Sequence, residues 1–233
     1  MTFTLIGFCP ATRKIGVCKT TTTPAGGGRS FRIVPGIGAL TVQAHTDFQQ
    51  MDLGVKLLQM GYNPRKVLSE LGDSDRFPEH RQIAIVDMRG ETAARTGSKA
   101  RPWSGHIEGN NFVAAGNFLV GEQVVKAMAA SFESTASEAL EERLLRAVEA
   151  GYAAGGQPDR ITSSAILVQQ HHAFPIVNLR VDVALEPLKE LRRIFDWYKP
   201  LIPHFTNRNE DPTSVRNWKQ IFREQGLPLN PYG

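Results

Sequence analysis

Histidines, cysteines and glycine-rich turns are the usual places to look for chemistry, and here most of them exclude common sites. His171 and His172 are adjacent, and neighbouring residues of an extended strand point to opposite faces, so we do not expect them to bind one metal ion. No set of Cys, His and Asp has zinc-site spacing. Gly26–Gly28 is not followed by Gly-Lys-Ser/Thr, so it does not predict a phosphate loop. Cys9 and Cys18 have no histidine nearby in sequence and are predicted to be small buried residues. We therefore expect no metal and no cofactor.

Two groups of polar residues stand where a loop or a strand end can present them to a ligand. His106 and Trp103 fall in residues 96–110, a segment predicted to be a long loop, and loops carry function disproportionately often. His106 either orients a substrate or only bonds its own loop. His45 ends a predicted strand, next to Thr46 and Asp47, and either tunes specificity or has no role. These three residues and Trp103 are predicted to contact substrate.

Arginine and aspartate flank two of the predicted strands. Arg81 and Asp87 bracket one, and Arg180 and Asp182 lie in another. Each charge either forms an ion pair or binds a substrate carboxylate, and surface ion pairs are the commoner use. Arg180 is the preferred carboxylate clamp, because a planar guanidinium suits two parallel hydrogen bonds.

Alternating β-branched and apolar residues, and helical periodicity, predict the elements that would hold these side chains. Strands are predicted over residues 2–8, 15–23, 37–45, 82–87, 91–95, 111–116, 163–170 and 175–182. Helices are predicted over 51–61, 63–72, 121–133, 137–152, 185–198 and 214–224, with Asn63 and Ser137 as N-caps.

The order of these elements predicts the fold class. Most neighbouring strands are joined by tight turns, so they should pair antiparallel, and helices that follow in separate blocks indicate a layered α+β fold. No internal repeat or linker divides the chain. We predict one domain over residues 1–205, with residues 206–233 as an extension that packs on the domain or on a partner subunit.

Composition narrows the function classes further. The chain has 233 residues, 41% of them hydrophobic, and a net charge of +4. Its basic residues are scattered rather than grouped with aromatics, so nucleic-acid binding is not expected. The N-terminus lacks the features of a signal peptide and no apolar run would span a membrane, so we expect a cytoplasmic protein that does not bind membranes. The aromatic C-terminal segment predicts a homodimer or higher homo-oligomer, unless it folds back on its own domain.

Several local patterns resemble the bacterial family called domain of unknown function 1028. They are, in chain order, Thr2–Ile6 with Ile15–Val17; Glu79–Gln82 with Val86, Asp87 and Gly90; Thr96 and Gly97 with Trp103–His106 and Gly109; Gly116 and Asn117 with Leu119, Gly121, Val124, Val125, Ala127, Met128, Phe132 and Glu133; Glu149–Gly151 with Ala153–Gly156; and Leu179–Asp182 with Glu190–Arg193. The resemblance extends to about residue 198, and its weight lies in the order and spacing of the blocks.

The resemblance implies a fold and a reaction. The family is grouped with the N-terminal nucleophile (Ntn) hydrolases, whose fold is a four-layer αββα sandwich with two mainly antiparallel sheets. In such enzymes the first residue of the mature chain attacks an amide, and its own α-amine takes the proton, because that amine titrates near the working pH. Initiator methionine is generally removed before small residues, which would leave Thr2 first. Thr2 is therefore the implied nucleophile, although it can also be an ordinary strand residue, and a chain that keeps Met1 has no free threonine amine.

The same resemblance gives roles to supporting residues. Asn117 is the implied oxyanion donor, with His106 as a second candidate, while a Gly-Asn turn in which Asn117 caps a helix is an equally good interpretation. Family members commonly have Ser-Lys near the end of the second strand, where this chain has Thr21 and Thr22. Lys19 lies three residues away, and this odd offset predicts that it points to the opposite face.

Two classes of function remain open. The first is a cofactor-free amidohydrolase that cleaves a small linear amide with Thr2. The second is a small-molecule-binding or structural protein that kept the fold and lost turnover, which the missing lysine would favour. In both cases the expected partner is a small molecule.

Overall fold

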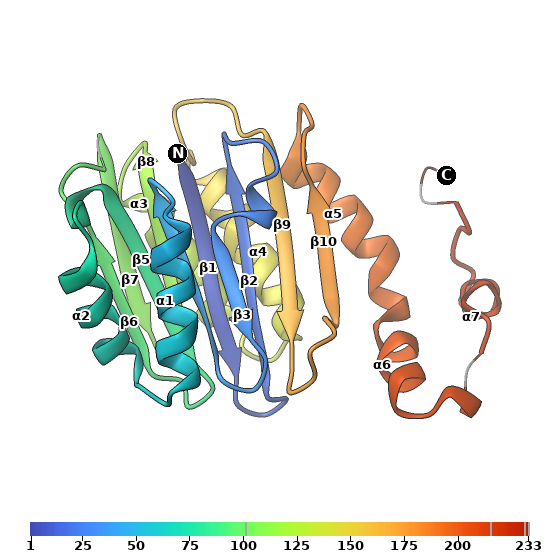
Figure 1. Ribbon diagram of the computed structural model, residues 1–233. Coiled ribbons are helices and arrows are strands. Elements are labelled where there is room, and N and C mark those ends of the chain that lie inside the picture. The colour runs from blue at the N-terminus through green and yellow to red at the C-terminus, as the bar shows by residue number, and fades with distance from the viewer. Residues whose placement is uncertain (101, 215, 231, 233) are drawn as a thin grey trace.

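The computed structural model describes residues 1–100, 102–214, 216–230 and 232. The chain alternates blocks of strands with blocks of helices (Figure 1). The strands are β1 (Thr2–Cys9), β2 (Lys14–Thr21), β3 (Phe31–Val34), β4 (Gly38–Ala44), β5 (Arg81–Asp87), β6 (Thr92–Thr96), β7 (Trp103–Gly109), β8 (Phe112–Leu119), β9 (Ser163–Gln169) and β10 (Val177–Val181). The α-helices are α1 (Phe48–Gln59), α2 (Pro64–Ser74), α3 (Gln123–Ser134), α4 (Leu140–Ala153), α5 (Pro187–Tyr198), α6 (Ile202–Glu210) and α7 (Trp218–Glu224).

The strands form two antiparallel sheets. A six-stranded sheet has the order β10-β9-β2-β1-β8-β7, and a four-stranded sheet has the order β3-β4-β5-β6. Every strand pair in both sheets is antiparallel. The prediction of an α+β chain built on antiparallel sheets is confirmed. β1 lies inside the larger sheet, between β2 and β8, so its first residue is held by neighbours on both sides.

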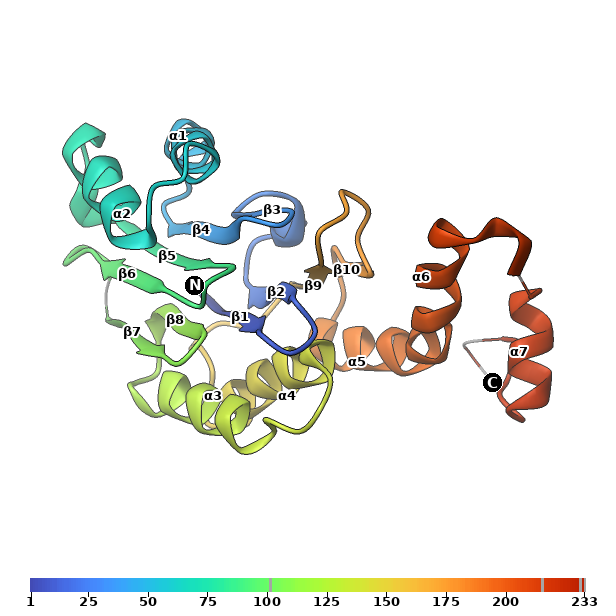
Figure 2. The ribbon, with the colours of Figure 1, turned by 90° about the horizontal axis from the view of Figure 1, so that it is seen from below.

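Helices cover the outer face of each sheet (Figure 2). α1 and α2 pack on the smaller sheet through a buried cluster that includes Met51, Leu57 and Leu71. α3 and α4 pack on the larger sheet through a cluster in which Phe3 contributes from β1 and Phe132 from α3. Burial of these apolar faces is the main force that holds the layers together.

The layer between the two sheets changes character along the strands. Successive residues of a strand alternate between its faces. On β1 the residues that face the other sheet begin with Thr2 and Thr4 and continue with Ile6 and Phe8, of which the last two join a buried apolar cluster between the sheets. The paired residues of β2 run the same way, from Thr21 and Lys19 to Val17 and Ile15. One end of the layer is therefore an apolar core, and the other is lined with polar side chains.

Two strands were not predicted correctly. Residues 96–110 were expected to form a loop, but Trp103–Gly109 form β7, which pairs with β8 at the edge of the larger sheet. The glycines and polar residues of this segment hide the alternation, because an edge strand that is only half buried needs no apolar face. β3 was missed because it is four residues long and directly precedes a turn.

Helices α1 to α5 begin and end within a few residues of the predicted positions, and one predicted cap is wrong. α7 begins later than predicted, and α6 was not predicted. Asn63 caps α2 as predicted, its Oδ1 accepting from Lys66 N. Ser137 does not cap α4, which begins at Leu140 after Ala139. None of the helices within the described ranges combines the length and the apolar character needed to cross a bilayer.

The C-terminal helices continue from α5 away from the sheets (Figures 1 and 2). α5 is fixed to α4 by ion pairs of Arg192 with Glu142 and Glu149, and Trp197 near its end contacts Trp218 and Phe222 of α7. The predicted boundary between residues 205 and 206 falls within α6. The division into a domain and an extension stays a prediction.

Candidate functional site

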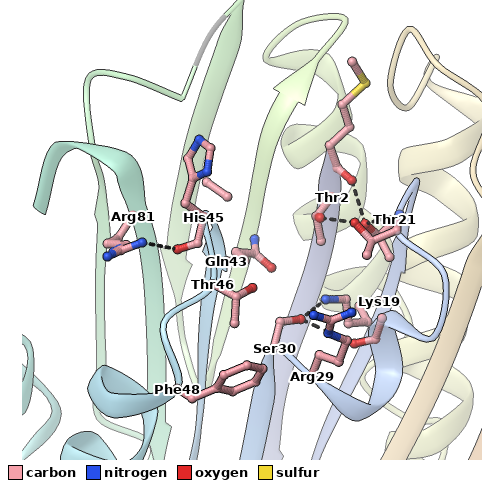
Figure 3. A pocket seen from close by; sticks show the side chains of 14 residues that line it. Thr2, Lys19, Thr21, Arg29, Ser30, Gln43, His45, Thr46, Phe48 and Arg81 are labelled. Carbon is pink, nitrogen blue, oxygen red and sulfur yellow. Dashed lines mark hydrogen bonds between the residues drawn. The ribbon is translucent and has the colours of Figure 1, made fainter. Parts of the chain in front are cut away.

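A cavity of about 450 Å³ opens at the polar end of the layer between the sheets (Figure 3). Its wall combines the start of β1, the end of β2, the loop from β2 to β3, the end of β4, the loop into α1 and the start of β5. The lining residues are Met1, Thr2, Lys19, Thr21, Thr23, Gly26, Arg29, Ser30, Gln43, Ala44, His45, Thr46, Phe48 and Arg81. None of these has a carboxylate side chain, whereas three are lysine or arginine.

Thr2 lies in this wall with only 7% of its surface exposed. It pairs with Thr21 of β2 across the sheet, and the two hydroxyl oxygens are 2.9 Å apart. Thr21 Oγ1 also donates to the carbonyl oxygen of Met1 at 2.8 Å and accepts from the backbone N–H of Thr23 at 3.2 Å. The Thr21 hydroxyl therefore links Met1, Thr2 and Thr23 by hydrogen bonds at the start of the chain.

Counting protons fixes the direction of the Thr2 hydrogen bond. A threonine hydroxyl has a single proton to donate, and Thr21 gives its proton to Met1. Thr2 must therefore donate to Thr21. While Met1 is attached, the Thr2 nitrogen is a peptide amide and cannot accept a proton, so Thr2 does not carry its own base.

Lys19 corrects the expectation from the offset in the sequence. It was predicted to point away from the site, but it lines the cavity, since it pairs with Thr4 across the sheet as Thr21 pairs with Thr2. Thr22, from which the offset was counted, lies just beyond the end of β2. Lys19 is 2% exposed, and burial lowers its pKa to about 7. Its Nζ donates to the hydroxyl of Ser30.

The Met1 α-amine, like Lys19, has a pKa that is lowered by burial. Burial lowers the pKa of the Met1 α-amine below its usual value of 8.0, and the charge of Lys19 lowers it further, while Asp159 works in the opposite direction. Amines in this part of the protein are thus held toward their neutral form, which can accept a proton.

The three basic side chains of the cavity wall differ in whether an acidic side chain balances their charge. Arg81 is paired with Asp47 and Asp75, at 3.1 and 3.0 Å, and also donates to the His45 carbonyl (Figure 3). Within the described part of the chain, neither Lys19 nor Arg29 has an acidic partner within ion-pair distance. The cavity therefore has a net positive charge.

The predicted substrate-contact run lies at the cavity, but its members do different things. His45 and Thr46 line the wall. Asp47 does not; it caps α1 by accepting from Gln49 N and Gln50 N, and it pairs with Arg81. Just before them, Ala44 has a φ of 68°, a left-handed conformation that is unusual for a residue other than glycine. This turn ends β4 and brings His45 toward Arg81.

Buried amides fill the layer behind the cavity. Gln82 Nε2 has three acceptors within reach, the carbonyls of Gly116 at 2.8 Å and Gly105 at 3.0 Å and the hydroxyl of Thr96 at 2.9 Å. Its two protons are shared among them, which fixes the orientation of the amide. Gln82 Oε1 therefore accepts, from Gln43 Nε2 at 2.8 Å and from Asn117 Nδ2 at 3.1 Å. Neither glutamine was predicted as a site residue, although Gln82 belongs to one of the motifs that resemble the family, because one amide among apolar strand residues does not reveal its partners.

Asn117 lies inside β8, opposite Thr2 in the register, so the interpretation of Gly-Asn as a helix-capping turn is wrong. One N–H of its amide is used by Gln82, and its Oδ1 is buried with no hydrogen-bond partner within the described structure. Phe118, which follows, has a φ of 54°. The unpartnered atom is thus an acceptor, whereas the sequence hypothesis needs a donor.

His106 and Trp103 lie on β7, and neither lines the cavity. His106 Nδ1 is 2.9 Å from Thr96 Oγ1, which itself accepts from Gln82, so the threonine proton is free to go to the imidazole. Burial lowers the pKa of His106 below 6.5, although Glu108 opposes this. His106 therefore reaches the cavity only through the buried amides, and its catalytic role stays a prediction.

Three other predicted features lie elsewhere. Arg180 bonds Asp182 at 2.8 Å and is not part of the cavity wall. His171 and His172 are not in a strand, and their ring centroids are 3.9 Å apart, so the argument from opposite faces was wrong. No third ligand joins them within the described residues. Cys18 is buried as predicted, and burial raises the pKa of its thiol, which leaves it unreactive.

Comparison with known proteins decides the family. The model of a family of unknown function, DUF1028, matches residues 2–191. The chain belongs to the DUF1028 family. A crystal structure of the DUF1028 protein SPO2555 from Silicibacter pomeroyi is similar, with 27% identity and a TM-score of 0.78, covering 85% of this chain and 89% of that one. No curated protein matches the sequence.

More distant structures are similar only loosely. Anbu (ancestral beta-subunit) from Yersinia bercovieri has 12% identity and a TM-score of 0.43, with 88% of this chain and 96% of that chain covered. This likeness is too weak to support an argument. All the lining residues of the cavity except Met1 lie within the DUF1028 match, whereas α6 and α7 lie beyond it.

Proposed function

We propose that this DUF1028 protein is a cofactor-free amidohydrolase of the N-terminal nucleophile type, with a four-layer αββα fold and Thr2 as its nucleophile. The proposal depends on one observation. Thr2 is the first residue of a central strand, and its hydroxyl lies in the wall of a positively charged cavity. The layers of helix, sheet, sheet and helix around that strand support the assignment (Figure 2).

Removal of Met1 would supply the missing base. It would turn the Thr2 nitrogen into a free α-amine and release the proton that Thr21 now gives to Met1. Such amines normally titrate near pH 8, and the burial that lowers the pKa of the Met1 amine would act on its successor too. A neutral amine next to its own hydroxyl is both base and nucleophile in one residue.

The proposed reaction forms and then hydrolyses an ester of Thr2. Thr2 Oγ1 attacks the amide carbon while the Thr2 amine takes the hydroxyl proton, and the carbonyl electron pair moves to oxygen. Collapse of this intermediate expels the leaving amine, which takes the proton from the Thr2 ammonium group. Water activated by the same amine then cleaves the threonine ester and restores the hydroxyl.

The charge of the cavity indicates the class of substrate. Lys19 and Arg29 face it without acidic partners, and a guanidinium binds a carboxylate through two parallel hydrogen bonds. We assign to Arg29 the clamp role predicted for Arg180. The substrate is then a small linear amide with a carboxylate group, held between Arg29 and Thr2. Asn117, whose Oδ1 lacks a partner within the described structure and which pairs with Thr2 across the sheet, would accept a hydrogen bond from the Thr2 amine.

The test uses protein whose lack of Met1 is verified by intact mass. A panel of small acylated and carbamoylated amino acids is screened, and turnover is compared with Thr2→Ala and Thr2→Ser. Loss of the hydroxyl should lower kcat/KM by at least about 10³-fold, while serine should keep part of the activity. Equal turnover by Thr2→Ala of any substrate found would remove Thr2 from the mechanism.

A second candidate is a binding protein without turnover. The observation in its favour is Met1 itself, which lines the cavity and whose carbonyl oxygen accepts the hydrogen bond from the Thr21 hydroxyl. A protein that keeps Met1 in its native host and binds a small carboxylate without cleaving it would fit this function. The mass of the natively produced protein separates the two candidates.

A further inference from the structure

Ser30 is a hydroxyl in the cavity wall that the mechanism above does not use. It is the last residue of the loop before β3 and is 5% exposed. Its carbonyl accepts from Thr41 Oγ1 at 2.6 Å and from Val42 N at 3.1 Å, so β4 holds its backbone in place. Its side-chain oxygen is hydrogen-bonded to Lys19 Nζ (Figure 3) and lies 3.5 Å from the Gly26 carbonyl.

Lys19 is placed to act as a base for this hydroxyl. No acidic side chain lies in the cavity wall to hold its proton. The side-chain amine of Lys19 is buried and has a pKa of about 7, so in a large share of the molecules it is neutral near pH 7. The lone pair of a neutral amine can accept the proton of the Ser30 hydroxyl, to which its Nζ is hydrogen-bonded. Serine beside an uncharged lysine is a known form of activated nucleophile.

We propose that Ser30 and Lys19 form a serine–lysine nucleophile–base pair that is competent while Met1 is still attached. The pair shares the cavity with the proposed Thr2 site but does not depend on Thr2. In a chain that keeps Met1, Thr2 has no free α-amine of its own, whereas Ser30 keeps Lys19. The probe class is a small ester or another activated acyl or phosphoryl group that fits a cavity of about 450 Å³.

The reaction balances without a further reagent. Ser30 Oγ attacks the carbonyl carbon of an ester as its proton passes to Lys19 Nζ, and the carbonyl electron pair moves to oxygen next to the charge of Arg29. The carbonyl re-forms, the bond to the leaving alcohol breaks, and Lys19 returns the proton to that alcohol. Water, deprotonated by Lys19, then releases the acid and restores Ser30.

The experiment is covalent labelling of protein that retains Met1. The protein is produced with methionine aminopeptidase inhibited, and intact mass verifies that Met1 is present. Diisopropyl fluorophosphate is added, so that an oxygen–phosphorus bond forms and fluoride leaves, and peptide mapping locates the adduct. We expect one adduct per chain, on Ser30, with a labelling rate that rises with pH around pH 7.

Variants separate the pair from a merely reactive surface. Ser30→Ala should abolish labelling, and Lys19→Met should slow it at least about 10²-fold and remove the pH dependence around pH 7. Ser164→Ala is the matched control, because Ser164 is also a buried serine but bonds Thr20 and does not line the cavity. Its rate should be unchanged. Circular dichroism verifies that each variant is folded, and Ser30→Cys, labelled with iodoacetamide, reports whether Lys19 still activates this position.

The outcomes distinguish this inference from the proposed function. An adduct on Ser30 that needs Lys19 supports the pair. No adduct, or an adduct elsewhere in the chain that retains Met1, overturns it. Labelling of Thr2 in Met1-free protein, with none at Ser30 in either form, would leave the proposed amidohydrolase standing and remove the pair. Failure of amide turnover together with Ser30 labelling would do the reverse.

Discussion

The layer between the two sheets has an apolar half and a polar half, and the same strands contribute to both. On β1, Ile6 and Phe8 belong to the apolar half, and Thr2 and Thr4 to the polar half. In the apolar half, contact is non-directional and burial alone stabilises it. In the polar half, each buried group needs a partner of the right kind, because an unsatisfied amide or hydroxyl costs about 1–3 kcal/mol. The comparison teaches that stability should reside in one half and chemistry in the other.

The largest effect is expected in the apolar half. Ile6→Ala removes a fully buried side chain from the cluster between the sheets, and we expect the free energy of unfolding to fall by about 3 kcal/mol. Urea denaturation followed by circular dichroism measures this. Any activity per folded molecule should be nearly unchanged, and a large loss of activity in protein shown to be folded would contradict the division into two halves.

A comparable but smaller loss is expected in the polar half from Gln82→Leu. Leucine nearly fills the space, but the Nε2 of Gln43, the Nδ2 of Asn117 and the carbonyl of Gly116 would lose their partner. We expect a loss of about 2–3 kcal/mol in thermal or urea unfolding. Gln59→Leu, on the exposed side of α1, is the control and should change stability by less than about 0.5 kcal/mol. An equal effect of both changes would mean that the buried amides do not support the layer.

Lys19→Met is expected to stabilise the protein. The pKa of Lys19 is lowered from 10.5 to about 7 by burial. Between these pH values the unfolded chain binds the proton and the folded chain does not, so wild-type stability rises with pH across this window and the cost of the buried charge is greatest at or below pH 7. The variant lacks that cost, and we expect it to gain about 2 kcal/mol at pH 7.

The pH dependence is the sharper part of that prediction. The gain should shrink as the pH rises from 7 toward 10, since the wild-type protein recovers stability there. Lys56→Met, at an exposed position of α1, is the control and should show neither the gain nor its pH dependence. Thermal melts at several pH values test both variants. A gain that does not change between pH 7 and pH 10 would show that Lys19 is not held neutral in the folded protein.

The sequence predicted the scaffold better than the site, for physical reasons. Alternation and tight turns revealed β1, β2, β5 and β8, because one face of each strand is apolar along much of its length. β7 was missed because its glycine-rich, half-buried sequence lacks that contrast. The resemblance of the motifs placed Thr2 in the site, but its role is a proposal.

The rest of the site depends on contacts across the two sheets. Ser30 contacts Lys19, and Arg29 lines the same cavity, only because the loop after β2 returns over the end of the strand. Lys19 itself was within reach of sequence reasoning. Counting in steps of two along Ile15, Val17, Lys19 and Thr21 places it on the inner face, whereas counting from Thr22 crosses the end of the strand.

The smallest expected effect is also the most direct test of how the halves differ. Thr4→Val keeps the shape of a buried side chain and makes it more apolar. By burial alone it should stabilise the protein. However, Thr4 Oγ1 donates to Gln43 Oε1 at 2.8 Å, and the other hydroxyl near that oxygen, Thr41 Oγ1, lies at 3.4 Å and gives its proton to the Ser30 carbonyl. The valine variant would therefore leave the Gln43 oxygen without a donor, and we expect a loss of about 1 kcal/mol.

Ile6→Val, two residues along the same face of β1, is the matched change in the apolar half and should cost a similar amount, about 1 kcal/mol, through the loss of a methylene group. Equal losses would then have different causes, which thermal melts of a second pair of variants separate. Adding Gln43→Leu removes the orphaned oxygen and should make the loss from Thr4→Val disappear, whereas it should leave the loss from Ile6→Val intact. If Thr4→Val stabilises the wild-type protein instead, the inner face of β1 is governed by apolar burial along its whole length, and the polar half does not exist as a separate energetic unit.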